Sequence, residues 1–220
     1  MIIVSLEGID KCGKGTQAEL LAKRLRNEGY RVVSSRFHRY GTPTGELIRR
    51  WLFTKSGHMP EGMEPYDVDQ KTIELIMAAD KQAQQEWISS LEDSTDVLIL
   101  DRGLCSQIAY GMIANKMANP DSKMEEIEKW LSCLTQYIRR SDLTIMIDIP
   151  AEESIRRKGE ESNDRYESNL ELLESVRSNY YYVLSKFSYS KDYAIVNGMQ
   201  PIDHVHEQVY LKTKLKLLEK

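Results

Sequence analysis

Disulfide frameworks, membrane spans and secretion signals have little support in this sequence. Its 220 residues include three cysteines, an odd number at unrelated spacings, which indicate neither a disulfide framework nor a paired metal-ligand pattern. The apolar run at positions 2–6 is too short for a signal peptide or a membrane span, and the acidic Glu7 follows it directly. The sequence therefore predicts a cytoplasmic protein with no membrane partner.

An excess of positive charge is missing as well. The chain carries 30 Lys and Arg against 34 Asp and Glu, a formal net charge of −4, whereas a protein that coats nucleic acid needs a broad positive field. We therefore expect no nucleic-acid partner. Small clusters of Lys and Arg are present, however, and a site that binds a few phosphates needs no more than that.

No linker, internal repeat or low-complexity tract divides the chain, so residues 1–220 are predicted to form a single domain. The apolar runs predicted as strands are residues 2–7, 30–37, 96–101, 143–149 and 193–196. Amphipathic segments predicted as helices are residues 16–27, 44–52, 69–91, 104–115, 122–138, 151–158, 169–187 and a last one from Pro201. Because strands that are apolar throughout are typical of parallel sheets covered on both faces, we expect a three-layer α/β/α fold with a central five-stranded parallel sheet.

A glycine-containing loop joins the first predicted strand to the first predicted helix, and its residues 8–14 read Gly-Ile-Asp-Lys-Cys-Gly-Lys. This is the order of a phosphate-binding P-loop. Glycines let successive backbone N–H groups turn inward, the helix N-terminus adds partial positive charge, and Lys14 supplies a full charge for the β- and γ-phosphates. An ordinary strand-to-helix turn is the structural alternative. The loop predicts a P-loop NTPase fold in which the donor nucleotide contacts Gly8, Ile9, Asp10, Lys11, Cys12, Gly13, Lys14, Gly15 and Thr16.

One position of the loop departs from the usual pattern. Gly15 stands where Ser or Thr usually holds Mg²⁺, and Thr16 comes one residue later. The run 13–17 is similar to the loop of adenylate kinases, so the variant is compatible with kinase chemistry. Thr16 and Asp101 are the candidate magnesium ligands, and direct ligation of the metal by a hydroxyl group is left open.

Four segments together resemble the thymidylate kinase family. Residues 101–110, Asp-Arg-Gly-Leu-Cys-Ser-Gln-Ile-Ala-Tyr, resemble its pattern Asp-Arg-(Tyr or His)-x-x-Ser-x-x-Ala-(Tyr or Phe), and they follow an interior strand, where open α/β sheets place ligands. Residues 6–10 resemble the family's entry to the P-loop, the pair Arg36-Phe37 also matches, and residues 163–167 resemble the segment behind its lid. The resemblance covers nearly the whole chain. It implies a homodimer that transfers the ATP γ-phosphoryl group to deoxythymidine monophosphate (dTMP) with Mg²⁺, giving dTDP.

The resemblance also implies roles for individual residues. Asp10 would lie near the acceptor 3′-hydroxyl and phosphate, Arg102 would bind that phosphate, and Asp101 would belong to the magnesium and phosphate network. Tyr110 would pack beneath the deoxyribose and exclude a 2′-hydroxyl. The other residues placed at the acceptor are Phe37 in the base pocket, Ser106, Gln107 and Tyr166 over the sugar.

Two stretches depart from the family's pattern on the acceptor side. Where the family often has Phe-x-x-x-Arg on the long third helix, this chain has Met77 and Lys81, which are four residues apart and share one helical face. Lys offers a point charge instead of a planar fork, so the base preference is left open. After Phe37 the sequence also differs, and Arg39 is the candidate to contact the acceptor phosphate there.

Donor and acceptor are both anionic, so the reaction needs cations between them. The residues predicted to act in catalysis are Lys14, Asp10, Arg102, Asp101, Arg157 and Arg165. A polar, charged segment at about residues 156–167 is predicted to be a short lid, and it contains Arg157 and Arg165. Lys11 in the loop is an equal candidate for the catalytic cation.

Three alternatives remain at the level of sequence. A deoxynucleoside kinase would need a general base near the sugar, which residues 101–102 could supply, but an uncharged acceptor has no need of arginines for a phosphate. A monophosphate kinase of different base preference is a related alternative. A nucleotide-binding module without catalysis is a more distant one.

Overall fold

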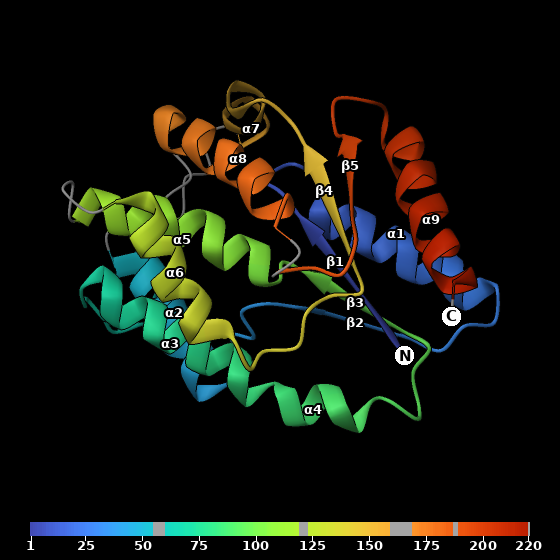
Figure 1. Cartoon of the computed structure of the whole chain (residues 1–220), viewed down its shortest axis with the longest axis horizontal. Helices are drawn as coiled ribbons and strands as arrows, with labels where there is room; N and C mark the ends of the chain where they lie inside the picture. The colour runs from blue at the N-terminus through green and yellow to red at the C-terminus, as the bar shows by residue number, and fades with distance from the viewer. Residues whose placement is uncertain (55–59, 119–122, 159–168, 187–188, 220) are drawn as a thin grey trace.

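A five-stranded parallel sheet forms the centre of the protein (Figure 1). The computed structural model describes residues 1–54, 60–118, 123–158, 169–186 and 189–219. The strands are β1 (Ile2–Glu7), β2 (Val32–Arg36), β3 (Val97–Asp101), β4 (Leu143–Asp148) and β5 (Tyr193–Asn197), in the order β2-β3-β1-β4-β5. Every residue of β1 is buried, as expected for the middle strand of a sheet covered on both faces.

Helices cover the two faces of the sheet. They are α1 (Lys14–Asn27), α2 (Pro43–Thr54), α3 (Gln70–Ala83), α4 (Gln85–Ser90), α5 (Leu104–Ala118), α6 (Met124–Thr135), α7 (Ala151–Lys158), α8 (Leu170–Leu184) and α9 (Ile202–Leu218). Helices α1 and α9 pack together on one face, and α5 packs against α8, α6 and α3 on the other (Figure 1). The predicted three-layer α/β/α fold is confirmed. No helix in the described ranges is long and apolar enough to cross a membrane.

The register of the sheet brings acidic strand ends to one edge. Leu6 of β1 pairs with Asp101 at the end of β3, and Leu6 also pairs with Ile145 of β4. All strands run in the same direction, so the loops that follow β1 and β3 leave the sheet at the same edge and next to each other. This edge is where parallel α/β sheets bind ligands.

The long helix predicted at residues 69–91 is wrong in one respect, because the chain forms two helices that meet at Gln84. The backbone N–H of Gln84 bonds to the carbonyl of Lys81, three residues back, at 3.2 Å. The side chain of Gln85 also donates to that carbonyl, at 2.9 Å. Polar side chains that compete for backbone groups in this way interrupt a helical ladder, and the apolar periodicity carries no sign of the interruption.

A close backbone contact holds the loop after β2 against α2. A Cβ atom built on Gly45 would lie 2.0 Å from the carbonyl oxygen of Arg39, whereas one built on Gly41 would meet nothing within 4 Å. We expect Gly45→Ala to lower the free energy of unfolding by about 1–3 kcal/mol, because the clash is with backbone that must move. Gly41→Ala is the control and should change it by less than about 1 kcal/mol. Urea unfolding followed by circular dichroism measures both, and equal midpoints would contradict the close contact.

Candidate active site

The P-loop has the backbone conformation that anion binding requires. Gly8, Lys11 and Gly13 have positive φ angles of 132°, 56° and 104°. A Cβ atom on Gly8 would lie 2.5 Å from the carbonyl oxygen of Ile147, so only glycine fits between the loop and β4. The curled loop leads directly into α1, whose N-terminal N–H groups therefore face the space enclosed by the loop.

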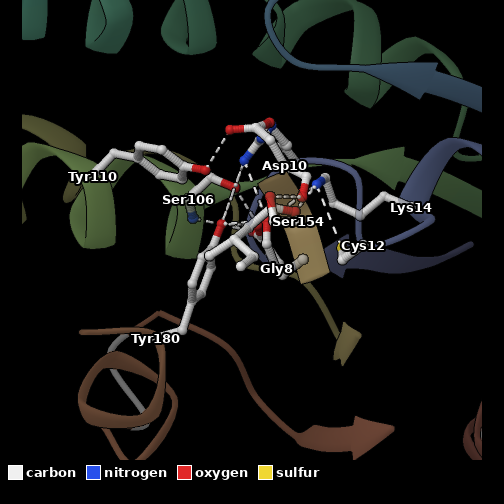
Figure 2. Close-up of polar contacts among 11 residues, drawn as sticks. Gly8, Asp10, Cys12, Lys14, Ser106, Tyr110, Ser154 and Tyr180 are labelled. Atoms are coloured by element: carbon white, nitrogen blue, oxygen red, sulfur yellow. Dashed lines mark hydrogen bonds and ion pairs between the residues drawn. The ribbon is translucent and has the colours of Figure 1, made fainter. Parts of the chain in front are cut away.

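Lys14 lies folded across the loop. Its side chain is buried, and Nζ donates hydrogen bonds to the carbonyl oxygens of Gly8 at 3.1 Å and Ile9 at 2.9 Å. Figure 2 shows the ammonium group near Cys12, whose sulfur lies 3.6 Å from Nζ. These contacts hold the positive charge at the mouth of the loop, where the phosphates of a donor nucleotide would lie.

Asp10 joins the P-loop to the residues that follow β3. Its carboxylate forms an ion pair with the guanidinium of Arg102 and accepts a hydrogen bond from the Tyr110 hydroxyl at 2.8 Å (Figure 2). Burial raises the pKa of Asp10, but the charges of Arg102 and Lys14 outweigh it, and the net pKa is lowered. Asp10 is therefore a carboxylate held between two cations.

Next to Arg102 lies a network of buried polar groups centred on the carboxylate of Glu7. Glu7 accepts hydrogen bonds from the backbone N–H of Gly103 at 2.8 Å and from the Ser106 hydroxyl. The Tyr180 hydroxyl of α8 lies 2.8 Å from Ser106 Oγ. Burial raises the pKa of Glu7, although hydrogen bonds from Ser106 and the charge of Arg102 oppose the rise. Because each buried polar group has partners, the network fixes the start of α5 relative to β1.

Asp101 faces the first turn of α1. A Cβ atom on Gly15 would lie 3.6 Å from Asp101 Oδ2, and Asp101 Oδ1 is buried without a hydrogen-bond partner. Thr16 is exposed on the next position of α1. The predicted magnesium ligand Asp101 thus lies beside α1 at the end of β3, and the predicted acceptor arginine, Arg102, is the next residue in the chain.

Eight of the ten predicted acceptor residues line one cavity of about 250 Å³. Those that line it are Asp10, Phe37, Met77, Lys81, Arg102, Ser106, Gln107 and Tyr110. A second cavity, of about 570 Å³, lies between α1 and the end of β2 and is lined by Gly15, Arg39 and Asp101 among others. Arg36 lines both, so the two cavities adjoin at the end of β2.

Lys81 extends from α3 into the smaller cavity from a buried position. Its exposed fraction is 2%, and its ammonium lies 5.5 Å from the centroid of the Phe37 ring. Burial lowers the pKa of Lys81 to about 8, although the charges of Asp80 and Glu74 oppose the shift. The charge is therefore held close to an aromatic ring at the wall of the cavity.

Comparison with known proteins fits this geometry. The sequence profile of the family described as Thymidylate kinase matches residues 6–209. The chain belongs to the thymidylate kinase family. A probable thymidylate kinase of Pyrococcus abyssi is 33% identical over 98% of this chain and 97% of that protein, and a thymidylate kinase of Thermoanaerobacter sp. is 29% identical over 94% of each.

A solved structure agrees in fold. The thymidylate kinase of Candida albicans superimposes with a TM-score of 0.80 at 24% identity, covering 98% of this chain and 93% of that one. The P-loop NTPase fold predicted from the loop is therefore confirmed, and family membership makes this kinase a phosphotransferase.

Two predicted cations of the kinase lie apart from the acceptor cavity. Arg39 donates to the side chain of Gln84 at 2.8 Å, and its guanidinium lies 4.4 Å from the Trp87 ring centroid, so it lines the larger cavity instead. Arg157 of α7 pairs with Glu153 and donates to the carbonyl of Gly198 at 2.8 Å. Its other contact, at 3.5 Å, is the carbonyl of Lys11, on the P-loop side of the site.

The rest of the predicted lid lies outside the described residues. Arg165 and Tyr166 fall within residues 159–168, as does most of the lid at residues 156–167. Their roles stay predictions.

Several residues of the site went unpredicted by sequence reasoning. The hydroxyl of Ser154 on α7 donates to the carbonyl of Asp10 at 2.6 Å, and Tyr180 and Glu74 also contribute polar atoms. Glu7 carried a signal, because an acid at the end of a mostly apolar strand is seldom buried without a role. Tyr180 carried none, because its apolar ring matches the helical pattern of a core residue.

We expect Lys14→Ala to lower kcat/KM for phosphoryl transfer by at least about 10³-fold, because the full positive charge at the donor phosphates is lost. Steady-state kinetics measure the loss, and circular dichroism with thermal melting checks that the fold is kept. Lys23→Ala, an exposed position of the same helix, is the control and should behave as the unsubstituted enzyme. Near-normal turnover by Lys14→Ala would refute this assignment.

Proposed function

We propose that this kinase transfers the γ-phosphoryl group of ATP to dTMP and releases ADP and dTDP. Membership of the thymidylate kinase family supports ATP as the phosphoryl donor. The observation that carries the proposal is the position of Asp10, which belongs to the P-loop and also pairs with Arg102 in the acceptor cavity. A donor held by the loop and an acceptor held by Arg102 would present their phosphates to each other across this one side chain.

Charge neutralisation is the main catalytic task in this arrangement. Two unit charges 4 Å apart repel by roughly 4 kcal/mol at an effective dielectric near 20, and the two nucleotides bring several such pairs together. Lys14 on the donor side and Arg102 on the acceptor side supply positive charge at the point of contact. Catalysis then consists mostly of positioning and of stabilising the charge on the transferred group.

Arg102 is the residue that favours a phosphorylated acceptor. Its guanidinium lies 5.2 Å from the Tyr110 ring centroid, and its position is fixed by Asp10 and by a contact of 3.3 Å with Ser106 Oγ. A planar cation held in this way is suited to bidentate binding of a phosphate. An uncharged nucleoside would leave it without an anionic partner, which argues against a deoxynucleoside kinase.

The residues at the end of β3 fit a magnesium ion. Asp101 has a buried oxygen without a hydrogen-bond partner and faces the first turn of α1. No group of three or more His, Cys, Asp or Glu side chains in the described part of the chain could hold an ion by itself, so the remaining ligands would be phosphate oxygens and water, the set that Mg²⁺ prefers. When bound, the ion would neutralise charge on the donor phosphates. We assign Asp101 as its protein ligand, with Thr16 as the nearest hydroxyl on α1.

A coupled assay of nucleoside diphosphate formation tests the proposed function. ATP and Mg²⁺ are supplied with each deoxynucleoside monophosphate and with thymidine in turn, and each reaction is repeated with EDTA in place of the metal. We expect dTDP from dTMP, no phosphorylation of thymidine, and loss of activity with EDTA. Turnover of thymidine but not dTMP would reject the proposal, and activity in EDTA would reject the magnesium site.

Tyr110 is proposed to exclude ribonucleotides from the acceptor cavity. Its ring packs edge-on against Tyr180, with centroids 6.4 Å apart, and its hydroxyl is held by Asp10, so it is a rigid wall. We expect Tyr110→Ala to raise kcat/KM for the ribonucleotide relative to dTMP by about tenfold or more, because a wall of the sugar pocket is removed. Tyr110→Phe keeps the ring and should keep the discrimination. Unchanged discrimination in Tyr110→Ala would remove this residue from the sugar pocket.

We also infer that the kinase is a cytoplasmic homodimer that does not bind nucleic acid. The family resemblance supports the dimer, the three unpaired cysteines support a reducing compartment, and the net charge of −4 opposes nucleic-acid binding. Size-exclusion chromatography with light scattering should give twice the mass of one chain.

A further inference from the structure

Helix α7 contacts the P-loop through two side chains that lie one turn apart. Ser154 is buried, and its hydroxyl donates to the backbone carbonyl of Asp10 at 2.6 Å (Figure 2). Arg157 donates to the carbonyl of Lys11 at 3.5 Å and to that of Gly198 at 2.8 Å. Because both side chains start from α7, the position of this helix decides where the Arg157 guanidinium lies beside the loop.

Helix α7 is short and has no N-terminal cap from the residue that precedes it. It contains eight residues, about two turns, and a helix of this length is marginal without support from other elements. The preceding residue is Pro150, whose side chain has no atom that can accept a hydrogen bond from the first N–H groups of the helix. A cap for α7 must therefore come from elsewhere in the fold.

Helix α8 supplies that cap. It packs beside α7 (Figure 1), and Glu174 Oε1 accepts a hydrogen bond from the backbone N–H of Ala151, the first residue of α7, at 3.0 Å. Ala151 has an exposed fraction of 0%, so water cannot easily replace this bond. A carboxylate at this end of the helix also interacts favourably with the helix dipole.

The same helix holds the turn that receives the Arg157 guanidinium. Arg177 of α8 donates two hydrogen bonds to the carboxylate of Asp148, at 2.7 and 2.8 Å, and Asp148 is the last residue of β4. The backbone carbonyl of Asp148 accepts a hydrogen bond from the N–H of Gly198 at 2.8 Å, and the carbonyl of Gly198 holds Arg157. Helix α8 therefore fixes both the helix that carries Arg157 and the turn that this side chain contacts.

We propose that Glu174 is a positioning residue for phosphoryl transfer, because by capping α7 from α8 it holds Arg157 against the P-loop on the donor side of the site. Glu174 acts through α7. A misplacement of about 1 Å in a group that contacts the reacting phosphates can cost about 10²-fold in rate. This inference goes beyond the proposed function and rests on it in one respect, which is ATP as the phosphoryl donor.

Steady-state kinetics on two variants of Glu174 test the proposal, with ATP and dTMP varied in turn. We expect Glu174→Ala to lower kcat/KM for ATP by about tenfold, because α7 loses its cap, and to leave KM for dTMP within about twofold. Alanine favours helix, so α8 itself is not weakened. Glu174→Gln keeps an acceptor oxygen for the N–H of Ala151 and should stay within about threefold of the unsubstituted enzyme.

Glu171→Ala is the matched control, because Glu171 is an exposed acid three residues earlier on the same helix. It should leave kcat/KM for ATP and KM for dTMP unchanged. The assignment is overturned if Glu174→Ala has the kinetics of this control. It is also overturned if Glu174→Ala raises KM for dTMP as strongly as it lowers kcat/KM for ATP.

A double-mutant cycle separates positioning of Arg157 from a general loss of stability. Arg157→Ala alone should lower kcat/KM for ATP by about 100-fold or more, because a cation beside the donor phosphates is removed. Adding Glu174→Ala to that variant should lower the constant by less than a further twofold or so, because the side chain that Glu174 positions is already gone. Losses that multiply, or no loss in Arg157→Ala, would contradict the proposal.

Failure of the proposed function would be seen separately. If the unsubstituted enzyme forms no dTDP from ATP and dTMP, the proposed function fails, and the Glu174 kinetics are then measured with the acceptor that the coupled assay identifies. If the unsubstituted enzyme is active and the Glu174 variants match it, only the positioning role fails.

Discussion

The repulsion between two anionic nucleotides is the constraint around which this site is organised. The response is positive charge from Lys14 and Arg102, and Asp10 of the P-loop holds the guanidinium of Arg102 in place through an ion pair. The lowered pKa of Asp10 favours its charged form, which stabilises the ion pair with Arg102. Lys14 on the other side is held by loop carbonyls in the same manner. Positive charge is therefore in place before either nucleotide arrives, which is the preorganisation that electrostatic catalysis needs.

Preorganisation of this kind depends on a second layer of buried polar groups. Glu7 is wholly buried at the end of β1, and its carboxylate accepts hydrogen bonds from the backbone N–H of Gly103 and from the hydroxyl groups of Ser106 and Tyr180. A buried carboxylate is tolerable only where such donors surround it. The same network ties three elements, β1, α5 and α8, to one geometry. The orientation of Arg102 is thus a property of the packed core as much as of the residues next to it.

The cavity lined by Arg102 and Lys81 has different chemistry at its two ends. At one end Asp10 and Arg102 form an ion pair, whereas Glu74 Oε2 and Gln107 Oε1 are buried without a hydrogen-bond partner. Lys81 is buried nearby with a lowered pKa, and Met77 lines the same cavity. Buried polar groups without a hydrogen-bond partner lower the stability of the folded protein.

The sequence by itself determined those features of this protein that depend only on residues close together in the chain. The P-loop at residues 8–14, the Asp-Arg pair after β3 and the alternation of buried strands with helices are visible in the sequence, because each is set by short-range geometry and by burial periodicity. The parallel three-layer fold follows from that alternation.

Only the tertiary structure decided which side chains from distant elements meet. The Tyr180 hydroxyl lies 2.8 Å from Ser106 Oγ, although the two residues are 74 positions apart in sequence. Arg39 donates to Gln84 and lines the larger cavity. Glu74 is buried where α3 packs against α5. The break between α3 and α4 belongs to the same class, because side-chain hydrogen bonds compete there with the helical ladder. Periodicity in a sequence reports which face of an element is buried, but the partner of a buried polar atom is chosen by packing between elements.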